Sequence, residues 1–137
     1  MDFIDTNLIV YANDRRDREK QARALAVVRE AIREGSGVIS VQVLQEYANT
    51  ALNKLGQTPA VVLRQLALLE SMTVVRPDPK MVGRAVELKS LFQISFWDAS
   101  ILAAAESAGC RRLFTEDLNE GQVYGAIRVV NPLRTVI

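Results

Sequence analysis

Residues 2–11 read DFIDTNLIVY, and this stretch contains the first unit of the fold. Its first four residues predict a short strand, and Thr6-Asn7 predict a turn or helix cap before a second apolar run. Asp5 is therefore expected at the carboxyl end of a strand. In α/β sheets, ligands bind at this end of the strands. Asp5 is a candidate functional residue by its position alone.

The rest of the chain repeats this alternation of strand and helix. Four further segments predict strands: Val38-Ile39, Thr73–Val75, Arg112–Thr115 and Ile127–Val130. Apolar spacing, caps and stop residues predict the longer helices over 14–34, 40–55, 58–70, 78–91 and 96–108. Such an alternation predicts an α/β fold, in which a parallel sheet is covered on both faces. We expect one domain over residues 1–137, because no repeat or linker divides the sequence.

The composition excludes several classes of enzyme. The chain has 137 residues, 49% of them hydrophobic, which suits one globular domain. It contains no histidine, so Ser-His or Cys-His catalysis and zinc sites of His and Cys are excluded. Carboxylates remain, and they suit oxygen-ligated cations such as Mg²⁺ and Mn²⁺. The 17 basic and 16 acidic residues neither favour nor exclude a polyanionic partner.

The sequence also bears on the compartment of the protein. The single cysteine, Cys110, has no partner for an internal disulfide, and the opening residues do not resemble a signal peptide. No apolar segment has the length of a membrane span. We therefore expect a reduced, cytoplasmic protein without a membrane partner.

Asp98 lies in a segment whose other residues, from Phe96 to Ala105, are almost all apolar. A helix that is apolar on every side is buried. A buried carboxylate requires a compensating cation or several donors, and a metal ion is one solution. Ser95 and Asp98 also have the spacing of a capping box, in which the carboxylate serves the helix end. The local pattern favours neither interpretation.

The other candidate acids have similar ambiguities. Asp5 and Asp117 each follow a predicted strand, where an acid can bind a ligand, form a turn or cap a helix. Glu116 and Glu120 lie close to Asp117 and compete for its role. Glu46 lies on the polar face of its helix, where a glutamate is ordinarily solvated. By its pattern alone, Glu46 is the weakest candidate.

Taken together, these segments resemble those of PIN domains. The chain closely resembles the VapC-like toxins of bacterial type II toxin–antitoxin pairs. The similarity rests on residues 3–7 (FIDTN), 45–46 (QE), 96–99 (FWDA) and 113–117 (LFTED), which have the order and approximate spacing of the family's acids. It implies a three-layer α/β/α fold with a short parallel central sheet.

The resemblance also implies a site and an activity. It places four catalytic and metal-binding acids on Asp5, Glu46, Asp98 and Asp117. Asn7 and Thr115 match supporting polar residues of the family. The implied protein is an Mg²⁺- or Mn²⁺-dependent endoribonuclease, in which metal-activated water cleaves RNA phosphodiesters. The implied partners are RNA, a cognate antitoxin protein and a second copy of the chain.

An RNA substrate also requires cations for its phosphates. A basic cluster that follows the first predicted helix is a candidate: Arg15, Arg16, Arg18 and Lys20. A solvated helix start is the ordinary explanation, although basic residues there oppose the helix dipole. Arg111 and Arg112 form a second candidate pair. No aromatic-rich stretch indicates a stacking platform for single strands.

Two other functions remain open from the sequence. A PIN-like scaffold would bind RNA or a protein without cutting it, although the presence of all four family acids argues against this. A phosphatase that uses Asp5 as its nucleophile would also begin with a strand followed by an acid. It would need a second acid shortly after Asp5, where Asn7 stands.

Overall fold

A computed structural model describes residues 1–134, which are built around a six-stranded sheet in the order β3-β2-β1-β4-β6-β5. Neighbouring strands are parallel except β5, which pairs antiparallel with β6 at one edge. The strands are β1 (Asp2–Ile4), β2 (Gly37–Ser40), β3 (Thr73–Val75), β4 (Arg112–Phe114), β5 (Val123–Tyr124) and β6 (Ile127–Val130). The predicted strands are all present, and β5 is the strand that the sequence pattern did not predict.

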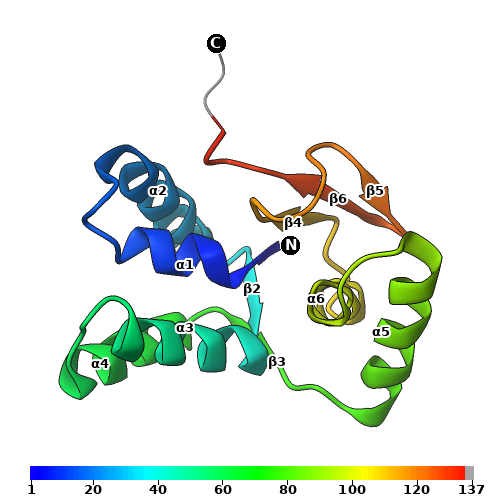
Figure 1. The fold of residues 1–137 in the computed structure, drawn as a ribbon, viewed down its shortest axis with the longest axis horizontal. Coiled ribbons are helices and arrows are strands. Elements are labelled where there is room, and N and C mark those ends of the chain that lie inside the picture. The colour runs from blue at the N-terminus through cyan, green and yellow to red at the C-terminus, as the bar shows by residue number, and fades with distance from the viewer. Residues whose placement is uncertain (135–137) are drawn as a thin grey trace.

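Helices cover both faces of this sheet. They are α1 (Thr6–Ala12), α2 (Arg18–Glu34), α3 (Val41–Asn53), α4 (Pro59–Leu69), α5 (Pro79–Phe92) and α6 (Phe96–Ser107). Figure 1 shows α1 and α2 on one side of the strands and α5 and α6 on the other, while α3 and α4 lie below α1. The predicted α/β/α architecture with a short, mostly parallel sheet is confirmed. None of the described helices is both long and apolar enough to cross a membrane.

The helices α3, α4 and α5 begin where their capping residues predict. Ser40 Oγ accepts from the Val43 amide at 3.3 Å, and Asp78 Oδ1 accepts from the Met81 amide at 2.9 Å. Both contacts satisfy amides that the first turn of a helix leaves without a partner. Proline follows the cap at the start of α4 and of α5, where its missing N–H has no cost.

The second helix begins later than the sequence predicts. The expected start was Asp14, but α2 begins at Arg18, with Asp17 accepting from the Lys20 amide at 3.1 Å. Asp14 instead accepts from the backbone and guanidinium of Arg16, which holds residues 14–16 in a turn. Such side-chain to backbone contacts compete with helix formation.

The core lies between the sheet and the helices on either side. Phe3 and Ile4 of β1 and Val38 and Ile39 of β2 are fully buried, as expected for parallel strands covered on both faces. Ile4 of β1 pairs in register with Phe114 of β4. These two central strands therefore end side by side, and the residues that follow them meet at one edge of the sheet.

Candidate metal centre

The adjacent ends of β1 and β4 hold the carboxylate of Asp5 in place. The Asp5 amide donates to the Phe114 carbonyl at 3.0 Å, which continues the strand pairing by one residue. The Thr115 hydroxyl donates to Asp5 Oδ2 at 2.8 Å, and the Thr6 amide donates to Asp5 Oδ1 at 2.7 Å. Asp5 is thus the cap of α1, and both of its oxygens have a fixed orientation.

Two further aspartates converge on Asp5. One carboxylate oxygen from each of Asp5, Asp98 and Asp117 lies within 4.8 Å of the other two. Asp98 comes from the first turn of α6, and Asp117 comes from the loop after β4. In an octahedral Mg²⁺ site, adjacent ligand oxygens lie about 2.9 Å apart and opposite ones about 4.2 Å apart. A hard divalent cation therefore suits this all-oxygen set once the side chains move inward.

The electrostatics of the cluster also favour a cation. Burial raises the pKa of the Asp5 carboxyl to about 7, against the lowering effect of the Thr115 and Thr6 hydrogen bonds. Asp117 is exposed as a residue, but partial loss of solvent around its carboxyl raises its pKa, and the negative charge of Asp98 adds to this shift. A bound cation would favour the ionised form of these carboxyls.

The sequence predicted a buried carboxylate at Asp98, and this prediction is wrong in detail. Asp98 is half-buried, and its neighbour Trp97 is 66% exposed. The buried carboxylate is that of Asp5, which is 6% exposed. The helix cap is made by Ser95, whose Oγ accepts from the Asp98 amide at 3.0 Å. Among the described residues, the Ser95 amide donates no hydrogen bond to the Asp98 carboxylate, and one oxygen of this carboxylate lies near those of Asp5 and Asp117 instead.

Glu46 lies at the rim of the cluster. It is exposed on α3, as its pattern predicted, and its Oε1 accepts from Gln42 at 2.8 Å. It lines the same pocket as the three aspartates, and its negative charge contributes to the raised pKa of Asp5. The four predicted acids therefore face one pocket, three of them in direct proximity and Glu46 farther out.

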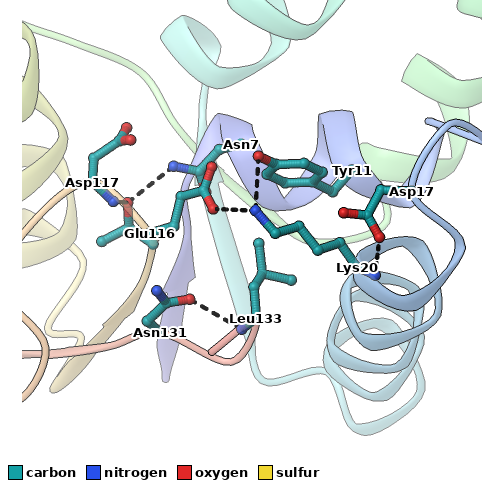
Figure 2. A network of polar contacts seen from close by, with 9 residues as sticks. Asn7, Tyr11, Asp17, Lys20, Glu116, Asp117, Asn131 and Leu133 are labelled. Atoms are coloured by element: carbon teal, nitrogen blue, oxygen red, sulfur yellow. Dashed lines mark hydrogen bonds and ion pairs between the residues drawn. The ribbon is translucent and has the colours of Figure 1, made fainter. Parts of the chain in front are cut away.

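The two acids that compete with Asp117 point elsewhere. Glu116 Oε2 lies 3.4 Å from the Lys20 ammonium, which is also 3.4 Å from the Tyr11 hydroxyl (Figure 2). Glu120 accepts a hydrogen bond from the backbone amide of Asn131. Of the three neighbouring acids, Asp117 is the one whose carboxylate joins the cluster.

Asn7 and Thr115 connect the elements that carry these acids. The Thr115 hydroxyl donates to Asp5 and accepts from Asn7 Nδ2 and from the Asp117 amide, each at 3.1 Å. Asn7 Oδ1 and the Thr6 hydroxyl are buried without a hydrogen-bond partner in the described part of the chain. Both residues line the carboxylate pocket, where a hydrated cation would offer such atoms a partner. The sequence did not single out Thr6.

Only some of the predicted basic residues lie near this pocket. Lys20 contacts Glu116, the neighbour of Asp117 in the chain, while Arg16 pairs with Asp14 at 2.9 Å. Arg112 pairs with Asp2 at 2.8 Å, at the amino ends of the strands and so at the opposite edge of the sheet. Of these three cations, the structure brings Lys20 to the edge of the site.

Comparisons with known proteins bear on the family and the fold. The family model described as PIN domain matches residues 3–124, a range that contains all four acids. A toxin–antitoxin complex from Klebsiella pneumoniae has a similar structure, with 21% identity, coverage of 96% of this chain and 98% of that chain, and a TM-score of 0.69. No curated protein sequence matches.

Two other solved structures are similar at comparable identity. VapC20 from Mycobacterium tuberculosis, described as a toxin that cleaves the sarcin–ricin loop, has 20% identity, coverage of 85% of this chain and 92% of that chain, and a TM-score of 0.64. A DNA-bound VapBC from Salmonella typhimurium has 18% identity, coverage of 93% and 95%, and a TM-score of 0.64. At these identities, the likeness concerns the fold.

Proposed function

Since the chain belongs to the PIN domain family, we propose that it is a metal-dependent endoribonuclease and the toxin of a toxin–antitoxin pair. The observation that carries this proposal is the convergence of Asp5, Asp98 and Asp117 within 4.8 Å from three separate elements. Glu46 faces the same pocket from a fourth. The cleavage of the sarcin–ricin loop attributed to the similar VapC20 supports RNA as the substrate.

In this proposal the three aspartates hold one or two Mg²⁺ or Mn²⁺ ions. Bound metal supplies a water nucleophile at neutral pH and stabilises the charge that develops on the phosphodiester. Thr115 and Thr6 keep the Asp5 carboxylate oriented toward the other acids, so little rearrangement is needed. Glu46 either binds a cation or orients the attacking water from the rim of the pocket.

The substrate would approach past Lys20. Its ammonium lies 3.4 Å from Glu116, beside the loop that carries Asp117. A phosphate adjacent to the scissile one can exchange this partly exposed ion pair, whose atoms are 3.4 Å apart, for a contact of its own, because ion pairs in contact with water contribute little to stability. Lys20 would thus offset part of the repulsion between the acidic site and the RNA backbone.

The partners follow from the same assignment. The similar structures include toxin–antitoxin complexes, and we propose that this chain binds a cognate antitoxin and forms a homodimer. Leu63 and Leu68 of α4 are 67% and 53% exposed, which offers apolar surface for such contacts. We place the protein in the cytoplasm, where its single, buried Cys110 would remain reduced.

The test is cleavage of RNA by the purified protein with added Mg²⁺ or Mn²⁺. We expect cleavage that chelator abolishes and that Asp98→Asn reduces by at least about a hundredfold, as for the loss of a group that stabilises the transition state directly. Asp78→Asn is the matched control, because Asp78 lies outside the cluster and asparagine retains its capping role. This variant is expected to cleave like the unaltered protein.

Other outcomes would contradict the proposal. Intact RNA across several substrates, despite bound metal, would indicate a PIN-like scaffold that binds without cutting. Turnover of a phosphomonoester with a trapped phosphoryl group on Asp5 would indicate the phosphatase.

A further inference from the structure

We propose that Trp97 forms one wall of a nucleobase-binding site beside the carboxylate cluster, and that this site takes the base next to the scissile phosphate of single-stranded RNA. The inference rests on the proposed function, because that function places the phosphate at the acids. The sequence contained no aromatic-rich platform, but the fold supplies a single aromatic surface next to the candidate metal centre.

The site is a second hollow adjoining the first. It lies between α3, α5 and α6, where Gln42, Met81, Phe96 and Trp97 are among its lining residues. Trp97 and Gln42 also line the carboxylate pocket. A nucleotide whose phosphate lies at the acids therefore has its base within reach of this second hollow.

The chemistry of the lining fits a base better than a phosphate. Its walls are mainly apolar, and the polar side chains of its lining are those of Ser40, Ser100, Gln42 and Gln45. Within the described residues, no charged side chain belongs to this lining. Nucleobases combine an apolar face with a polar rim, and apolar pockets with a few oriented polar groups bind such ligands.

Trp97 is held in a suitable way for stacking. Trp97 is 66% exposed, which leaves its indole accessible to a ligand. The Phe96 and Trp97 rings form a T-shaped pair, with centroids 5.4 Å apart and planes at 80°, and this contact restrains the indole. Stacking on an aromatic ring is tolerant of base identity, so Trp97 would contribute affinity for any single strand.

The experiment uses Trp97 itself as the reporter, because it is the only tryptophan of the chain. Asp98→Asn protein with Mg²⁺, which keeps Trp97, is titrated with a short single-stranded RNA and with an oligomer of abasic nucleotides of equal length. We expect the RNA to quench the tryptophan fluorescence and to bind about tenfold more tightly than the abasic oligomer. Equal affinity, or RNA binding without a fluorescence change, would overturn the proposal.

Variants separate stacking from other roles of the same surface. By anisotropy of a labelled RNA, Trp97→Ala is expected to remove the difference between RNA and abasic oligomer, and Trp97→Phe to keep most of it. Leu91→Ala is the matched control, since Leu91 is 68% exposed and lies outside this lining. If Trp97→Ala instead dissociates a dimer and leaves RNA affinity unchanged, a second copy covers the surface and the proposal is wrong.

The nuclease and the base site can fail separately. Cleavage of RNA together with equal binding of both oligomers would leave the nuclease intact and remove the base site. Quenching that depends on the bases, in a protein that cleaves no RNA with any added metal, would keep the base site and remove the nuclease.

Discussion

Asp5 is buried against two hydrogen-bond donors and faces two other carboxylates, so its protonation is coupled to folding. Its pKa is raised from 3.8 to about 7, chiefly by burial. The folded chain therefore binds this proton more tightly than the unfolded chain. Between about pH 4 and pH 7, the free energy of unfolding of the metal-free protein should fall by up to about 1.4 kcal/mol per pH unit from this group.

Urea unfolding in chelator at pH 5 and pH 8 measures this dependence. Asp5→Asn keeps an oxygen for the Thr115 and Thr6 donors but cannot titrate, so its stability should fall less between the two pH values. An unchanged dependence on pH in this variant would mean that Asp5 is ionised in the folded protein throughout.

Thr115 is the second residue whose loss has a defined consequence. Thr115→Val removes the donor to Asp5 and the acceptor for Asn7 and the Asp117 amide. We expect a loss of about 1–3 kcal/mol in the free energy of unfolding, because buried partners lose their hydrogen bonds. Metal affinity at pH 7 should also fall, since this hydrogen bond lowers the pKa of Asp5. Thr115→Ser keeps the hydroxyl and should restore most of the stability and most of the metal affinity, as measured by urea unfolding and calorimetric metal titration. If it does not, the methyl group of Thr115, and not its hydroxyl, is responsible for the loss.

At the scale of elements, Gly37 allows β2 to pack closely against the preceding helix. A Cβ added there would lie 2.6 Å from Met72 Sδ and 2.8 Å from Ala31 Cβ. Gly37→Ala should therefore cost about 1–3 kcal/mol in the free energy of unfolding, as overpacking does. Gly83→Ala, in the middle of α5 with open space around it, should instead add about 0.5–1 kcal/mol. Urea unfolding of both variants measures these changes. Similar changes in the free energy of unfolding for the two variants would contradict the close packing at Gly37.

The elements differ in how far the sequence could predict them. Helix starts at Ser40, Thr58 and Asp78 depend on contacts three residues away, so local chemistry predicted them. The exposure of Trp97 depends on which elements pack against the start of α6, and apolar periodicity contains no such information. The strand β5, which pairs with β6, spans only two residues, and an alternation of apolar and polar residues cannot be recognised over so short a segment.

The candidate site shows the same limit. Strand ends predicted Asp5 and Asp117, because adjacent parallel strands end at one edge of the sheet. The sequence could not show that Asp117, and not Glu116 or Glu120, joins the cluster. That choice depends on the ion pair of Glu116 with Lys20 and on the hydrogen bond of Glu120 with the Asn131 amide, which local patterns do not contain. The orientation of Glu46 toward the aspartates depends on the position of α3 as a whole, which its own helical pattern does not contain.

For the whole molecule, a net charge of +1 gives little general attraction to RNA. Basic side chains close to the site must then supply the salt-dependent part of RNA binding. Lys20→Gln should weaken RNA binding and reduce the slope of log affinity against log salt by about 0.7, the value for one contact to a single strand. Arg29→Gln, an exposed change farther along α2, is the control. Equal slopes for the Lys20 variant and the unaltered protein would exclude Lys20 from the phosphate contacts.

The three aspartates together should hold a divalent cation. Titration of metal-free protein with Mn²⁺ at pH 8, followed by electron paramagnetic resonance, measures bound and free ion directly. We predict binding by the unaltered protein and by Asp78→Asn, and affinity at least about tenfold weaker in Asp98→Asn, since even groups that only support a metal ligand change affinity by about 10- to 100-fold. Absence of Mn²⁺ binding, or equal affinity in Asp98→Asn, would contradict the account.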